Sequence, residues 1–89
     1  LVLADDSANP AYIAADLLAQ AEHGSGHERV WLVSTAPRLL KSVEREIQRQ
    51  LPTLSRRERI EPALKQNAWL IHVPDLEAGV ALANRLAPE

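Results

Sequence analysis

Apolar residues along the chain form short continuous runs that alternate with longer segments of three-and-four spacing. The continuous runs cover residues 1–4, 30–34 and 68–73, and each is too short for a helix. Such runs are typical of strands buried on both faces of a sheet. Helical patterns lie between and after them, so the order is strand, helix, strand, helix, strand, helix. This alternation predicts an α/β fold with a parallel sheet of about three strands and crossover helices.

Local signals mark the ends of the first two helices. Asn9 suits an N-cap, and Pro10 supplies a preset φ at the first helical position. The apolar stripe that follows predicts a helix ending at about His23. The second helix is expected to start around residues 35–37, and Pro52 stops it.

Two further helices are predicted towards the end of the chain. Ser55 and Glu58 have the spacing of a capping box for the first of these helices. Pro62 removes a backbone donor inside it, so we expect a kink or a short helix there. Asp75 is the predicted N-cap of the last helix, which Gly79 should weaken slightly.

Several side chains of the last helix and of the strands are also expected to be buried. The last helix has the spacing of a face that packs on the sheet, formed by Leu76, Val80, Ala83 and Leu86 or Ala87. Trp31 and Trp69 lie in predicted strands and are most simply core residues. His72 alternates with apolar neighbours in a strand, and we expect a packed, hydrogen-bonded side chain rather than a ligand.

Composition narrows the functional classes. The 89 residues are 46% apolar and 25% charged, with a formal net charge of -2, which is typical of a soluble globular protein. Without a basic excess, neither nucleic acid nor an anionic membrane is an expected partner. The chain has no Cys, which fits a reducing, cytoplasmic environment. It opens on a strand-like run without Met, so we expect residues 1–89 to be a single incomplete unit of a larger protein.

Gln20 and His23 form the most specific local feature. Residues three apart share a helical face, with Cβ atoms roughly 5–6 Å apart, so both side chains can reach one ion. Imidazole is a good zinc ligand and a carboxamide oxygen a weak one, so such a site needs stronger ligands from elsewhere. On spacing alone, the simpler interpretation is a polar helix end with His23 near the negative pole of the helix dipole.

Asp5 and Asp6 follow the first strand, where α/β proteins place ligand-binding residues. The run LVLADD is similar to the start of a response-regulator receiver, whose paired acids hold magnesium. A receiver needs its phosphoacceptor Asp at the end of the third strand, where this chain has a Pro before Asp75, and it needs a later strand with a Lys. Solvation of the loop is the simpler role for the two acids. Arg56 and Arg57 are likewise interpreted as a solvated helix start, and no G-x-G-x-x-G, Walker or G-x-S-x-G motif is present.

Three stretches, LVLADDSANP at 1–10, AADLLAQAEHG at 14–24 and NRLAPE at 84–89, together resemble histidinol dehydrogenase. The resemblance covers essentially the whole chain, and the block ending in Gln-Ala-Glu-His is highly specific. It implies a partial Rossmann-like unit with three layers, taken from a zinc- and NAD-dependent homodimeric enzyme of histidine biosynthesis. That enzyme oxidises L-histidinol to L-histidine in two hydride transfers to NAD.

The resemblance also implies roles for residues. Gln20 and His23 match the family's zinc- and substrate-binding Gln and His, and Glu89 matches the Glu that activates water. The remaining zinc ligands, an Asp and a second His, lie beyond this chain in the family, and the NAD contacts come from a neighbouring domain. We therefore expect an enzyme fragment that is inactive alone. The alternatives are a non-catalytic αβ interaction or receiver-like signalling module, and a chain that folds only by associating.

Overall fold

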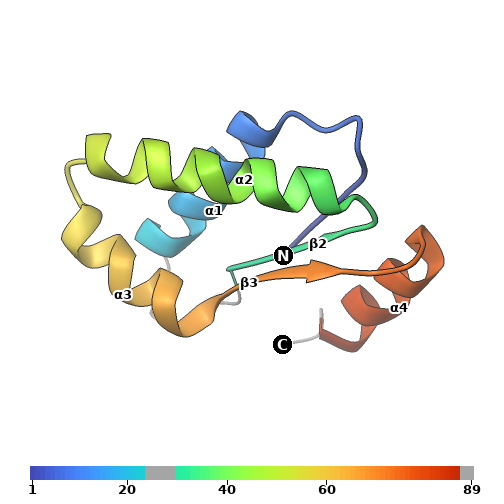
Figure 1. Cartoon of the computed structure of the whole chain (residues 1–89). Helices are drawn as coiled ribbons and strands as arrows, with labels where there is room; N and C mark the ends of the chain where they lie inside the picture. The colour runs from blue at the N-terminus through green and yellow to red at the C-terminus, as the bar shows by residue number, and fades with distance from the viewer. Residues whose placement is uncertain (24–29, 87–89) are drawn as a thin grey trace.

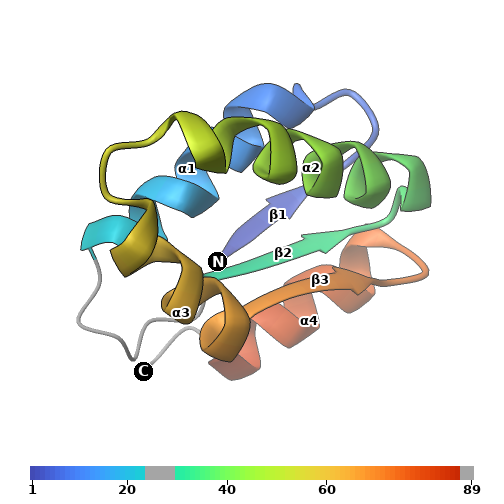
Figure 2. The same cartoon turned by 60° about the vertical axis from the view of Figure 1, so that its left-hand side comes forward.

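The computed structural model of the chain describes residues 1–23 and 30–86 and contains three strands and five helical segments within them. Along the chain these are β1 (Val2–Ala4), α1 (Pro10–His23), β2 (Val30–Ser34), α2 (Pro37–Gln50), the 3-10 turn η1 (Leu51–Thr53), α3 (Arg57–Asn67), β3 (Ala68–His72) and α4 (Leu76–Leu86). The strands pair in the order β1-β2-β3, and both pairings are parallel (Figures 1 and 2). This confirms the predicted α/β fold.

Helices lie on both faces of the sheet, which gives three layers. Figure 1 shows α1, α2 and α3 on one side and α4 on the other. Side chains alternate across a strand, so Leu32 faces the first group of helices, while Val33 faces α4. The arrangement confirms the expected three-layer, Rossmann-like parallel sheet.

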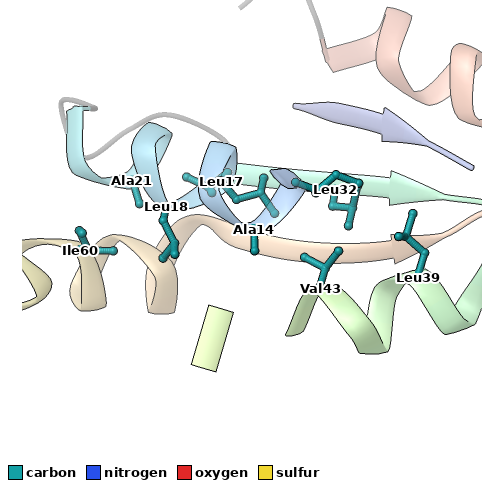
Figure 3. Close-up of a cluster of buried hydrophobic side chains, with 10 residues drawn as sticks. Ala14, Leu17, Leu18, Ala21, Leu32, Leu39, Val43 and Ile60 are labelled. Atoms are coloured by element: carbon teal, nitrogen blue, oxygen red, sulfur yellow. The ribbon is translucent and has the colours of Figure 1, made fainter. Parts of the chain in front are cut away.

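The main core lies between the sheet and the first three helices. Leu17 and Leu18 of α1 meet Leu32 of β2, Val43 of α2 and Ile60 of α3, and each of these side chains is at most 2% exposed (Figure 3). Burying one such side chain contributes roughly 1.5–3 kcal/mol. The core therefore joins α1 to every other element on this face.

Two of the three predicted helix caps, Asn9 and Asp75, are confirmed. The Asn9 Oδ1 atom accepts hydrogen bonds from the backbone N–H groups of Ala11 at 2.9 Å and Tyr12 at 3.4 Å. The Asp75 Oδ1 atom accepts one from Ala78 at 2.7 Å. Each cap satisfies N–H groups that have no partner inside the helix. The starts of α1 and α4 are thus fixed by local chemistry.

The start of α3 differs from the prediction. Its N-cap residue is Arg56, without a side-chain cap, so the Ser55 capping box is wrong. Ser55 lies one residue too early, although Glu58 still places a negative charge in the first turn. The helix also continues through Pro62 to Asn67. Pro62 is on the exposed side, where water can serve the carbonyl that it leaves without a donor.

Helix α4 is turned differently from the predicted orientation. Leu76 and Val80, expected to face the sheet, are 50% and 46% exposed, whereas Gly79 is buried and Ala83 is half-buried. A Cβ atom at Gly79 would lie 2.7 Å from the Leu3 Cδ1 atom. The helix therefore presents its glycine to the sheet, at a distance where an added Cβ atom would require the Leu3 side chain to move.

Two expectations for β3 are also wrong. The Trp69 side chain is 60% exposed rather than part of the core, and His72 is exposed rather than packed. Trp31, its partner across the parallel pair, is half-buried. The physical reason is position, because β3 is at the edge of this sheet and α4 contacts β1 and β2.

Candidate functional site

The last turn of α1 carries the predicted metal ligands. Because α1 follows β1 and returns before β2, its carboxyl end lies at the amino edge of the parallel sheet (Figure 2). The inner face of the helix is buried through Ala14, Leu17, Leu18 and Ala21. Packing of this face fixes the helix, and the opposite side is left for polar chemistry.

Gln20 and His23 lie one turn apart on that polar side. Gln20 is half-buried, and the His23 side chain is 73% exposed, so neither is sealed in the apolar core. An amide oxygen and an imidazole nitrogen fit the donor chemistry of zinc, but they are half of a four-ligand set. Among residues 1–23 and 30–86 there is no group of three or more His, Asp or Glu side chains placed to hold a metal. Further ligands would have to come from outside these residues.

A carboxylate connects this turn to α3. The Glu22 Oε1 atom lies 3.7 Å from Arg56 Nε, and its Oε2 atom lies 3.9 Å from His23 Nε2. The Glu22 side chain is 26% exposed, compared with 58% for Arg56. Sequence reasoning missed Arg56, which it interpreted as part of a solvated helix start. No local pattern could have revealed it, because the contact joins two helices far apart in the chain.

Glu89, the predicted catalytic base, lies outside the residues that the structure describes. Its position relative to Gln20 and His23 therefore stays a prediction. The described chain ends at Leu86, the last residue of α4. Since α4 follows β3 as α1 follows β1, its carboxyl end is also at the amino edge of the sheet. The topology places the end of α4 at the same edge of the sheet as Gln20 and His23.

The carboxyl edge carries the other acidic residues singled out by sequence. The Asp5 Oδ1 atom accepts hydrogen bonds from the Ser7 hydroxyl at 2.5 Å and the Ser7 backbone N–H at 2.9 Å. These two bonds lower the pKa of Asp5 because they favour its charged form, and the bond from the hydroxyl has the larger effect. Asp5 is therefore engaged in a local turn, in agreement with the loop interpretation.

Asp6 lies beside two neighbouring hollows of about 610 and 310 Å³. Arg38 at the start of α2 lines both of them, Thr35 lines the larger and Ser42 the smaller. The hollows thus contain one negative and one positive charge at the edge where α/β proteins bind ligands. Asp6 was a candidate from sequence, whereas Arg38 was not, since no motif links it to Asp6.

The structure also bears on a receiver-like function and on membrane-spanning helices. Asp75, the residue after the third strand that a receiver would need as an acceptor, is engaged as the N-cap of α4. This gives the receiver-like alternative no support. None of the helices in the described part of the chain is long and apolar enough to cross a membrane.

Comparison with known proteins matches the whole chain to one family. The family model for histidinol dehydrogenase matches residues 1–89. Histidinol dehydrogenases of Heliobacterium mobile and Thermus thermophilus are 51% and 49% identical over 89 residues, which is 100% of this chain and 21% of each relative. The crystal structure of histidinol dehydrogenase from Elizabethkingia anophelis superposes with a TM-score of 0.86 at 37% identity, over 93% of this chain and 19% of that one. The chain thus spans about a fifth of the length of the relatives that it matches.

Proposed function

The chain belongs to the histidinol dehydrogenase family, and we propose that it is one segment of an enzyme that oxidises L-histidinol to L-histidine. The observation that carries the proposal is the family match over all 89 residues, including the block with Gln20 and His23. The exposure of His23 supports the proposal, because a buried imidazole could not reach a metal ion that is held by other parts of the protein.

We assign Gln20 and His23 to the zinc site and to binding of the substrate through that site. Bound zinc would act as a Lewis acid and a template for the substrate's nitrogen atoms, without redox chemistry of its own. Two ligands of which one is weak seldom suffice, so the remaining ligands come from other segments, and the isolated chain is inactive. These residues bind and orient, and no bond is made or broken on them.

Glu89 is assigned the role of general base. The oxidation of an alcohol to an acid passes through an aldehyde, which must take up water before the second oxidation. A carboxylate near the aldehyde carbon can remove the proton from the attacking water. The chain has no dinucleotide-binding fingerprint, so we place the NAD contacts outside it. The family resemblance supports a cytoplasmic homodimer as the working assembly.

The zinc assignment is tested by His23→Ala in the full-length protein that carries this chain. We expect zinc affinity to fall by more than the roughly 10–100-fold typical of losing an outer-shell partner, with turnover abolished and the fold retained. Zinc content after dialysis, turnover of L-histidinol and far-UV circular dichroism measure the three effects. His72→Ala is the matched control, because His72 is also exposed but is the last residue of β3, at the opposite edge of the sheet. Unchanged zinc content in His23→Ala would reject the assignment.

A further inference from the structure

The last turn of α1 and the start of α3 carry a row of three polar side chains, of which the zinc assignment uses only His23. It runs from Arg56 through the two oxygens of Glu22 to the imidazole of His23, with separations of 3.7 and 3.9 Å. Because each carboxylate oxygen faces a different partner, Glu22 bridges α3 to His23 rather than pairing with one side alone. We propose that Glu22, anchored by Arg56, is a positioning residue that sets the His23 imidazole for metal binding.

The backbone of Arg56 is held in place by the first turn of α3. The Arg56 backbone carbonyl accepts hydrogen bonds from the N–H groups of Arg59 at 2.9 Å and Ile60 at 3.1 Å, which fixes it at the start of α3. Ile60 is fully buried and belongs to the same core cluster as Leu18 and Ala21 of α1 (Figure 3). The two ends of the ion pair are therefore attached to helices that share one core.

His23, by contrast, has little packing to hold it. Its side chain is 73% exposed, whereas Glu22 is 26% exposed and already held between the two helices. An exposed imidazole loses rotamer freedom when it binds a metal, and a fixed neighbour reduces that cost by restricting the ring beforehand. Metal-binding histidines commonly direct the ring nitrogen that does not bind the metal towards a carboxylate, which fixes the orientation of the ring. Within residues 1–23 and 30–86, Glu22 has a carboxylate oxygen 3.9 Å from His23 Nε2.

Positioning and simple charge attraction predict opposite results for Arg56. If Glu22 acted only as a negative charge near a divalent cation, removing the positive Arg56 would strengthen zinc binding. If Arg56 holds Glu22 in place, its removal frees the carboxylate and weakens zinc binding. Replacement of Arg56 therefore separates the two mechanisms, and we expect weaker binding.

The inference rests on the proposed function, and its test uses the full-length protein with zinc as the probe. Zinc affinity is measured by competition with a chromophoric chelator, and the visible absorption of the cobalt(II)-substituted protein reports ligand geometry. We expect Glu22→Gln and Arg56→Gln each to weaken zinc binding by about 10-fold and to alter the cobalt spectrum. Arg57→Gln, the same charge change at the next residue, should leave both unchanged.

The outcomes distinguish failure of this inference from failure of the zinc assignment. Unchanged or tighter zinc binding in Arg56→Gln would overturn the positioning role, as would a loss of thermal stability in Glu22→Gln with unaltered zinc affinity. If His23→Ala loses zinc while both of these variants retain it, only the positioning role fails. If His23→Ala also retains zinc, the zinc assignment itself fails.

Discussion

The two faces of the sheet are covered very differently. On one face, α1, α2 and α3 bury a continuous cluster that includes Leu32 at 0% exposure. On the other face, α4 is the one helix of residues 1–23 and 30–86 that packs over β1 and β2, through Gly79, and Trp69 remains 60% exposed. The same strands therefore have a side-chain core on one face and a close backbone approach on the other.

This difference shows that helices can pack on the two faces of one sheet in two ways. Leucine, isoleucine and valine side chains fill the space between the sheet and the first three helices, and dispersion and the hydrophobic effect scale with the buried area. On the face covered by α4, the contact between helix and sheet depends on the absence of a side chain at Gly79, where the Leu3 side chain fills the space. The first face should tolerate a loss of volume poorly, and the second should tolerate a gain of volume poorly.

The largest expected effect is on the side-chain core. Leu32→Ala in the 89-residue chain removes a fully buried side chain at the centre of the cluster and should lower the free energy of unfolding by about 2–5 kcal/mol. Since small domains have only about 5–15 kcal/mol in total, this loss is a large share of the stability. Urea denaturation followed by circular dichroism measures the change. Leu76→Ala, at a 50% exposed leucine, is the control, and an equal loss in both variants would contradict the difference between the faces.

A smaller effect is expected at the close approach. Gly79→Ala gains about 1 kcal/mol of helix propensity, but its Cβ atom would meet Leu3 Cδ1 at 2.7 Å and force that side chain to move. Overpacking costs about 1–3 kcal/mol, so we expect a net loss of about 1 kcal/mol. The same change in a Leu3→Val background should lose less, because the clashing atom is gone. A double-mutant cycle measures this coupling, and strict additivity would show that the two positions do not meet.

Local signals in the sequence predicted most of the fold. The apolar runs located all three strands, and Asn9 and Asp75 located the starts of two helices because a cap acts within three residues. The orientation of α4 was not predictable in this way. It depends on contact between Gly79 and Leu3, which are distant in sequence, and the exposed positions Leu76 and Val80 have the same helical spacing as a buried stripe would.

The candidate site divides along the same line. Gln20 and His23 share a helical face because they are three residues apart. The helix that carries them, α1, ends at His23 as predicted. Their assignment to zinc came from family resemblance and not from spacing. The link to Arg56 could not be predicted, because it requires knowing that α3 packs against the end of α1.

The smallest effect is expected at Trp69 in β3. Trp69 lies on the face covered by α4, and the next residue of the strand, Leu70, lies on the core face, so the two faces can be compared within one strand. Trp69→Thr keeps a residue that favours strands and removes a side chain that is 60% exposed, so the free energy of unfolding of the 89-residue chain should change by less than about 0.5 kcal/mol. Leu70→Ala, one residue later, removes a side chain that packs against the core cluster and should cost more. Urea denaturation of both variants under the same conditions gives the two values. A large loss in Trp69→Thr would mean that the second face is held by more than the contact at Gly79, because an exposed side chain has little apolar contact area to lose.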